Sequence, residues 1–297
     1  MRLGEAVALG SAWTHQIART LGIRALLIKG DTLHQHGLRP ARVSADVDVL
    51  VEPDRFEEYC QAMAAAGWRE RPVPLISHQL SSHSRAYVHD SWPCDIDVHR
   101  YYPGFLKEAA EVFDVLWSRR GALEFAHTRV ESADRPSSIL ILALHSLRDG
   151  RVNARHQEEL EHLTSLELTA EERRDLGMLA LQTGSAATLA EVLPRFGVEV
   201  EPDRGDLESP ALRDWRGRVE SKSEGAYAWS VALSSAKWRD RPLIVWNAFW
   251  PAARELRLSH PQIGPGSIAV FGARVARWRR GMRGLPRSLR ALKSRRG

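Results

Sequence analysis

Hydrophobic residues follow two different spacings along the chain, and the change between them lies near residue 130. Before that point, short apolar runs alternate with polar positions, as in strands, and segments with helical spacing separate them. The predicted strands are 25–28, 47–51, 85–89, 94–100 and 123–130, and the predicted helices are 5–20, 31–36, 54–66 and 105–117. Pro53 and Gly67 mark the two ends of the clearest predicted helix.

The pattern is almost entirely helical from residue 136 to about residue 240. Strands in the first part and helices in the second predict an α+β (α/β) protein, with a sheet-containing N-terminal domain and a helical C-terminal domain. A length of 297 residues fits two domains. We expect domains of residues 1–132 and 133–270, the second closing over a cleft in the first, followed by a tail of residues 271–297.

The composition narrows the classes of protein to consider. Hydrophobic residues make up 43% of the chain, which is enough to build a core. No apolar run approaches the roughly 18 residues that a membrane span needs. The first residues lack the apolar segment and small-residue cleavage site of a secretory signal. We therefore expect a cytoplasmic protein without a transmembrane segment.

The positive charge of the chain is concentrated at its C-terminal end. The formal net charge is +5, but residues 271–297 contain ten Arg or Lys and no Asp or Glu, which leaves −5 for residues 1–270. A basic segment of this kind is compatible with a solvated terminus, with a contact to RNA phosphates, or with a contact to an anionic membrane. No recognisable RNA-binding motif accompanies it, so we favour the solvated terminus.

Acidic residues alternate with apolar ones on two of the predicted strands. Asp46 and Asp48 share one face of the first, and Asp95, Asp97 and His99 share one face of the second. A solvated strand end explains a single pair of acids equally well. If the strands are neighbours, however, Asp97 lies beside the first pair. Three converging carboxylates can hold two Mg²⁺ ions, the arrangement used for in-line phosphoryl transfer.

A longer stretch carries a family resemblance. The run LLIKGDTLHQHGLRPARVSADVDVLVEPDRFEEYCQAMAAAGW, followed by CDIDVHRYY, resembles the bacterial uncharacterised nucleotidyltransferase-like proteins of the DNA polymerase beta superfamily. In this resemblance, Gly30 matches the turn glycine, Asp46 and Asp48 match the metal-binding pair, and Asp97 matches the third acid. Lys29 and Arg42 match basic residues of the family, and His145 matches a histidine that it carries on a helix.

The resemblance implies a nucleotidyltransferase-type mixed sheet with helices and a defined reaction. The expected enzyme uses two Mg²⁺ ions, held by the three matched acids, to transfer a nucleoside monophosphate from ATP or another nucleoside triphosphate. The acceptor is a hydroxyl of a small molecule, a peptide, a protein or an RNA end, and pyrophosphate leaves. Asp97 could take the acceptor proton. Lys29 and Arg42 would neutralise phosphate charge, and the alternative for both is a surface ion pair.

One departure from the superfamily concerns the glycine turn. The superfamily usually places Gly-Ser or Gly-Gly there, whereas this chain has Gly30-Asp31. An aspartate facing a triphosphate is repulsive, so Asp31 must point away, cap the short helix or accompany altered chemistry. Thr32 could supply the hydroxyl that contacts phosphate. Two other classes of function therefore stay open: a catalytically silent nucleotide-binding scaffold, and a basic RNA-binding or membrane-binding protein that acts through residues 271–297.

Overall fold

The computed structural model describes residues 1–72, 83–150 and 153–220, and after them residues 233, 237–253, 256, 263–264, 266–276 and 278–279. The chain divides into two compact units. The first contains Met1–Arg71 and His83–Trp215, and the second contains Pro72–Ser82 and Arg216–Gly297. The predicted boundary at residue 132 falls inside the first unit, and the division into domains at that position stays a prediction.

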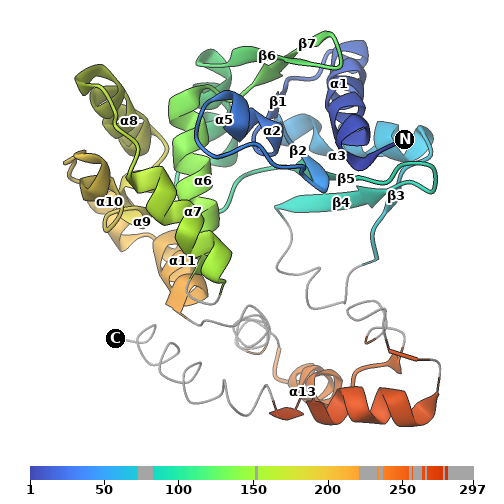
Figure 1. The fold of residues 1–297 in the computed structure, drawn as a ribbon. Helices are drawn as coiled ribbons and strands as arrows, with labels where there is room; N and C mark the ends of the chain where they lie inside the picture. Colours follow the sequence, from blue (N-terminus) through green and yellow to red (C-terminus); the bar gives the residue numbers. More distant parts are fainter. Residues whose placement is uncertain are drawn as a thin grey trace. The chain divides into compact units, whose positions relative to one another are not determined.

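A seven-stranded mixed sheet forms the centre of the first unit (Figure 1). Its order is β3-β4-β5-β2-β1-β7-β6. The strands are β1 (Ala25–Leu27), β2 (Asp46–Val51), β3 (Arg69–Glu70), β4 (Ser84–Val88), β5 (Asp95–His99), β6 (Gly121–Phe125) and β7 (Thr128–Ser132). Strands β2 and β5 are parallel, as are β1 and β7, and the other pairs are antiparallel. The predicted mixed sheet is confirmed.

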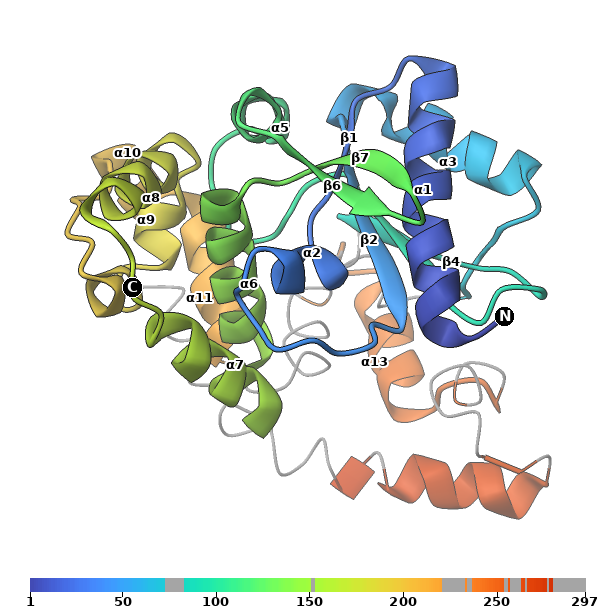
Figure 2. The ribbon, with the colours of Figure 1, turned by 45° about the horizontal axis from the view of Figure 1, so that its top comes forward.

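Alternate residues of the central strands face opposite sides of this sheet. On one side, Val47 and Val49 of β2 and Ile96 and Val98 of β5 are buried in an apolar core. Helices α1 (Leu3–Leu21) and α3 (Phe56–Ala65) cover that side (Figure 2). A short 3₁₀ helix, Pro53–Arg55, precedes α3, because the proline fixes the backbone of the first turn without needing its own N–H.

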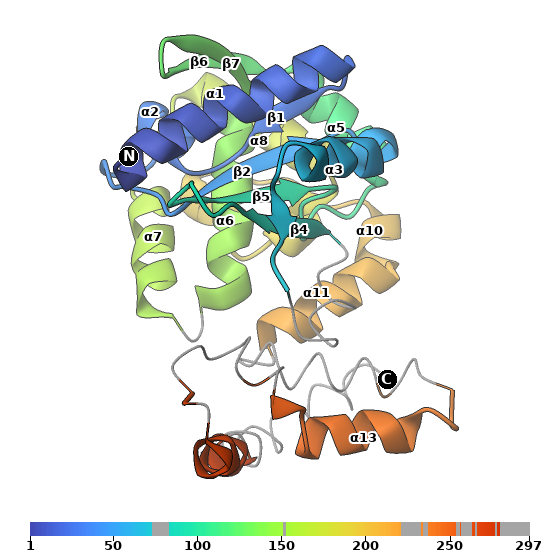
Figure 3. The same cartoon turned by 90° about the vertical axis from the view of Figure 1, so that its right-hand side faces the viewer.

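The other side of the sheet carries α2 (Asp31–Gln35) and α6 (Arg135–Gly150), with α7 (Ala154–Thr164) packed on α6 (Figures 2 and 3). The remaining helices of the first unit are α5 (Ala109–Ser118), α8 (Ala170–Gln182), α9 (Ser185–Thr188), the 3₁₀ helix Leu193–Phe196, α10 (Arg204–Glu208) and α11 (Pro210–Glu220), whose last residues belong to the second unit. The second unit contains α13 (Arg241–Phe249) and a helical segment at residues 267–276. Most of the basic segment 271–297 lies outside the described residues.

Two predictions from the sequence are wrong in detail. The single strand expected at 123–130 is a hairpin of β6 and β7, and Ala126 and His127 form its two-residue turn with φ values of 46° and 60°. Such turns usually contain Asn or Gly, and neither residue type occupies these two positions. The helix expected from residue 105 begins at Ala109, four residues later.

Among the described residues, no helix combines the length and the apolar character that crossing a membrane requires.

Candidate active site

The turn after β1 places a lysine and a glycine beside β2. The backbone N–H of Ile28 donates to the carbonyl oxygen of Asp48 at 3.2 Å, which keeps the chain next to β2 as β1 ends. Gly30 then adopts φ +65° and ψ −134°, a conformation that favours glycine. Its carbonyl oxygen accepts a hydrogen bond of 2.5 Å from Arg39, whose side chain is buried. The turn directs Lys29 toward β2.

The parallel register of β2 and β5 sets the acidic residues side by side. Asp46 pairs with Asp95, and Asp48 pairs with Asp97. Because both strands alternate, these carboxylates share the face of the sheet opposite the apolar core. The register thus confirms that β2 and β5 are neighbours and that Asp97 lies beside the acidic pair of β2.

Asp48 lies at the centre of the charged cluster and is 4% exposed. Its Oδ1 is 2.6 Å from the Lys29 Nζ and 2.9 Å from the His99 Nε2. Burial favours the protonated acid, but the Lys29 ammonium and the His99 hydrogen bond outweigh it and lower the pKa of Asp48. The same carboxylate raises the pKa of Lys29 against the effect of burial. Asp48 and Lys29 therefore form a buried ion pair.

Asp97 has the opposite electrostatic environment. Burial and the negative charge of Asp48 raise the pKa of Asp97 to about 7, and Lys29 offsets only part of this effect. Two neighbouring carboxylates thus differ in proton affinity, because the lysine contacts one and not the other. A carboxylate of raised pKa can accept a proton at neutral pH and is stabilised as an anion by any added cation.

His99 completes a group of three possible metal ligands. The ligand atoms of Asp48, Asp97 and His99 all lie within 4.8 Å of one another. Burial lowers the pKa of His99, an effect that the hydrogen bond to Asp48 opposes, and its Nδ1 has no hydrogen-bond partner among the described residues. Two carboxylates on one face provide the oxygen ligands that Mg²⁺ prefers. The residues present therefore fit a divalent cation.

Asp46 and Thr32, both singled out from the sequence, lie differently from this group. Asp46 shares the face but does not belong to the three-residue cluster, and its Oδ1 accepts a hydrogen bond of 2.9 Å from Ser44. Thr32 is fully buried on α2, and its hydroxyl has no hydrogen-bond partner in the part of the chain that the structure describes. Asp31 does not cap α2; its carboxylate accepts a hydrogen bond from Gln35.

Arg42 contacts a helix rather than the carboxylates of β2. Its Nη2 lies 2.8 Å from Oε1 of Glu159 on α7, and the Nη1 of Arg39 lies 3.7 Å from the same oxygen. Glu159 is 9% exposed, which makes this pair of arginines on one glutamate a largely buried arrangement. The sequence singled out Arg42 but neither Arg39 nor Glu159, because a buried ion pair between segments 117 residues apart leaves no local signal.

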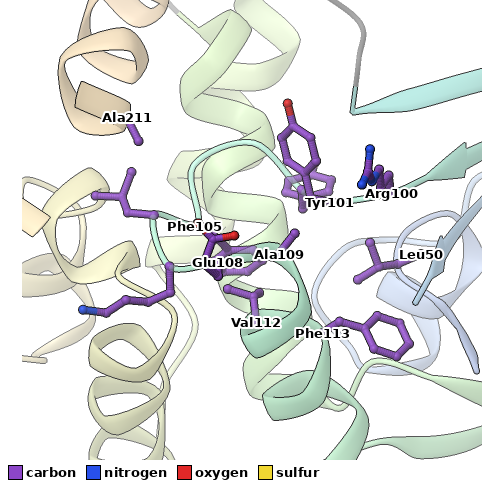
Figure 4. A pocket seen from close by; sticks show the side chains of 12 residues that line it. Leu50, Arg100, Tyr101, Phe105, Glu108, Ala109, Val112, Phe113 and Ala211 are labelled. Atoms are coloured by element: carbon purple, nitrogen blue, oxygen red, sulfur yellow. The ribbon is translucent and has the colours of Figure 1, made fainter. Parts of the chain in front are cut away.

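A pocket of about 210 Å³ lies beyond the C-terminal end of β5 (Figure 4). Its walls come from the end of β2, the segment after β5, α5 and α11; they include Leu50, Tyr101, Tyr102, Phe105, Val112, Phe113 and Ala211. The Tyr102 ring is also 5.9 Å from the Lys29 Nζ, so the pocket and the charged cluster share a neighbour. The aromatic walls suit a flat or apolar group.

Comparison with known sequences shows the family of this protein and, with it, the enzyme class. The profile of a family described as "uncharacterised nucleotidyltransferase" matches residues 14–167, more than half of the chain. The chain belongs to this family. The matched segment contains Lys29, Asp48 and Asp97 and extends through Glu159 on α7. Nucleotidyl transfer is therefore the enzyme class of this protein, as the sequence resemblance implied.

Two solved structures show limited similarity to this nucleotidyltransferase. An antigenic nucleotidyltransferase-like protein from Paracoccidioides brasiliensis is 12% identical, with a TM-score of 0.38 over 64% of this chain and 93% of that one. A tRNA-processing enzyme is 15% identical, with a TM-score of 0.26 over 92% of this chain and 78% of the other. No curated protein sequence matches the chain.

Proposed function

We propose that this nucleotidyltransferase transfers a nucleoside monophosphate, AMP from ATP in the first instance, to an acceptor hydroxyl in a Mg²⁺-dependent reaction that releases pyrophosphate. The observation that carries the proposal is the direct pairing of Asp48 with Asp97 across two parallel strands. This pairing supports a cation site on a sheet face that also holds Lys29. Family membership gives the class of reaction, and the pairing of Asp48 with Asp97 supports the choice of these residues as metal ligands.

The proposed roles follow from charge and position. Asp46, Asp48 and Asp97 would hold two Mg²⁺ ions, and bound Mg²⁺ would supply charge neutralisation at the phosphates and would lower the pKa of the acceptor hydroxyl. Asp97 is proposed to accept the hydroxyl proton. The acceptor oxygen bonds to the α-phosphorus as the bond from that phosphorus to the bridging oxygen of the β-phosphate breaks. Pyrophosphate leaves with that oxygen.

The basic and small residues of the turn are proposed to bind the triphosphate. Lys29 neutralises phosphate charge, Gly30 allows close approach of the backbone, and the buried Thr32 hydroxyl is a donor without a partner among the described residues. Arg42 must leave Glu159 to reach a phosphate, so its participation requires the ion pair to open. A small molecule, a peptide, a protein and an RNA end all remain candidate acceptors.

Calorimetric titration with ATP, GTP, CTP and UTP, each with and without Mg²⁺, tests the proposal. We expect Mg²⁺-dependent binding of ATP to the wild-type protein and its loss in Asp97→Asn, which removes one ligand without changing side-chain size. Asp90→Asn is the matched control, because Asp90 is exposed in the loop between β4 and β5 and pairs only with the exposed Arg69 among the contacts described. Binding of no nucleotide, or equal binding by Asp97→Asn, contradicts the proposal.

A catalytically silent scaffold is a second candidate, and one observation favours it. Asp48 already has Lys29 and His99 as partners, and an ion pair of this kind can neutralise the carboxylate without a metal ion. Mg²⁺-dependent ATP binding without pyrophosphate release, measured with a range of acceptor hydroxyl compounds, would support this candidate. Removal of residues 271–297 tests the third candidate, binding to RNA or membranes through the basic segment. If the protein acts in this way, the truncated chain should lose that binding, and binding of the full chain to RNA should depend steeply on salt concentration.

A further inference from the structure

A second cluster of metal-ligand side chains lies between two helices that pack on one another. His145 lies on α6, and His156 and Glu159 lie three residues apart on α7. Helices α6 and α7 lie side by side (Figure 3). The ligand atoms of the three side chains all lie within 4.8 Å of one another. The two imidazole rings are tilted by 54° with their centroids 4.7 Å apart. This cluster shares no residue with the group of Asp48, Asp97 and His99.

We propose that His145, His156 and Glu159 form a binding site for a transition-metal ion of the kind that prefers imidazole ligands, with Zn²⁺ as its first candidate. Two imidazole nitrogens and one carboxylate oxygen are a common protein donor set for Zn²⁺. The three side chains would supply three of the four ligands that Zn²⁺ usually takes. This inference does not rest on the proposed nucleotidyl-transfer reaction.

The two oxygens of Glu159 have different surroundings. Arg42 lies 2.8 Å and Arg39 lies 3.7 Å from Oε1. Oε2 is buried and has no hydrogen-bond partner among the described residues. Buried carboxylate oxygens without partners are unfavourable, and metal-ligating carboxylates are commonly held by hydrogen bonds or ion pairs from a second layer of residues. The arginines thus orient the carboxylate and leave one oxygen available.

His145 offers a buried ring nitrogen to the cluster. Its Nδ1 is buried without a hydrogen-bond partner in the part of the chain that the structure describes. Buried polar atoms are usually hydrogen-bonded, so a ring nitrogen without a partner is available to ligate a metal ion.

The surrounding charge predicts which metal ions the site accepts. Lys29 and Arg148 act on His145, and Arg39 and Arg42 contact Glu159, so the cluster has more basic than acidic neighbours. Mg²⁺ and Ca²⁺ bind mainly through charge and oxygen ligands, and this environment opposes them. Zn²⁺, Co²⁺, Ni²⁺ and Cu²⁺ form strong bonds to imidazole nitrogen, and these bonds can offset the repulsion.

A metal ion at this site would connect α6 with α7 and, through Glu159, influence the segment that precedes β2. Arg42 lies four residues before Asp46 and is held by Glu159 in the structure. Ligation of Oε2 would strengthen the orientation of the Glu159 carboxylate and hence the position of Arg42. The proposed site is therefore linked to the acidic face of the sheet without being part of it.

The test is a titration of the full chain with Co²⁺ and Zn²⁺ in excess Mg²⁺, which competes for the carboxylate site. Visible absorption reports imidazole ligation of Co²⁺, and calorimetry reports Zn²⁺ affinity. We expect His156→Gln to lower the affinity by about 100-fold. His162→Gln is the matched control, because His162 is exposed on the same helix and lies outside the cluster. Asp97→Asn removes a ligand of the other cluster and should leave this binding unchanged.

Three results would overturn the proposal: absence of Co²⁺ and Zn²⁺ binding, equal affinity in His156→Gln and the wild type, or loss of binding in Asp97→Asn with retention in His156→Gln. Thermal melting without metal checks that each variant folds, and His156→Asn replaces His156→Gln if that variant does not. Nucleotide titration of the same variants separates this proposal from the nucleotidyl-transfer proposal, because only Asp97→Asn should lose Mg²⁺-dependent ATP binding.

Discussion

The two faces of the central sheet are built from alternate residues of the same strands, yet they depend on different physical interactions. On β5, Ile96 and Val98 are buried in an apolar core under α1 and α3. Their neighbours Asp97 and His99 face a cluster of ionisable groups around Asp48. Packing on the apolar face is shared among many contacts, whereas Asp48 on the ionisable face relies on two specific partners, Lys29 and His99.

This difference predicts how each face responds to substitution. Removing an apolar side chain reduces the buried apolar area and leaves a cavity, and both effects lower the free energy of unfolding. Removing a charged group leaves its partner buried and unpaired, and the cost depends on which partner remains. Stability and nucleotide binding should therefore separate cleanly between residues that are adjacent in the sequence.

The largest effect is expected for Asp48→Ala. This change leaves the Lys29 ammonium without its buried partner and removes the acceptor of His99, and it should lower the free energy of unfolding by about 3–5 kcal/mol. Urea denaturation measures the loss. The double variant Lys29→Met with Asp48→Asn removes the unpaired charge and should recover most of it. Equal instability of the single and double variants would show that the ion pair is not the cause.

A smaller loss of stability is expected on the apolar face. Val98 is completely buried between Asp97 and His99 in the sequence, and Val98→Ala should lower the free energy of unfolding by about 2 kcal/mol. Mg²⁺-dependent nucleotide affinity of the folded variant should be unchanged. Asp97→Asn should have the opposite effects. Because it relieves repulsion from Asp48, the free energy of unfolding should change by less than about 1 kcal/mol, whereas nucleotide binding should be lost. Reduced affinity in Val98→Ala would contradict the separation of the faces.

The sequence predicted which residues form the ionisable face, because the alternation of polar and apolar residues along a strand is a local pattern. Alternation on β2 and β5 identified which residues share a face. The sequence left open whether the two strands are neighbours, and the register shows that they are. The contacts of Arg42 were not predictable in the same way. Its partner Glu159 lies on α7, and nothing in either segment indicates that the two meet. The roles of all the predicted site residues stay predictions: Lys29, Gly30, Thr32, Arg42, Asp46, Asp48 and Asp97.

The turns show the same limit of local information. The sequence identified Gly30 as a turn because glycine is the usual residue at positive φ. It missed the turn at Ala126 and His127, where residues with side chains adopt positive φ and the pairing of β6 with β7 maintains the conformation. Where tertiary pairing overrides the local preference of the chain, sequence patterns alone predict one strand instead of two.

Gly30→Ala tests how much the glycine turn contributes to the ionisable face. A Cβ atom at this position would be no closer than 3.8 Å to its neighbours, so the cost arises from the positive φ and not from a steric clash. We expect a loss of about 1.5 kcal/mol in the free energy of unfolding, measured in urea. Gly121→Ala is the control, because its surroundings are open and its φ is not positive, and it should change stability by less than about 0.5 kcal/mol. Equal effects of the two changes would rule out backbone strain at Gly30.

The smallest effect concerns a titratable group on the side of the sheet that α1 covers. His15 of α1 is buried, with its Nδ1 3.0 Å from Glu131. Burial lowers the pKa of His15; Glu131 opposes this effect and Arg19 adds to it. The unfolded chain therefore binds a proton more readily than the folded one, and stability should fall as the pH drops below about 6.5, the usual value for histidine.

From pH 7 to pH 6, this one residue can account for at most about 0.7 kcal/mol of lost stability. Urea denaturation at the two pH values measures the loss, and His15→Gln should reduce it. His127→Gln should not, because His127 is fully exposed in the turn between β6 and β7. If His15→Gln keeps the full pH dependence, Glu131 offsets the effect of burial on the pKa of His15. A single carboxylate would then stabilise a buried cation under α1 as Asp48 does on the ionisable face, and the two sides of the sheet would differ less than their composition suggests.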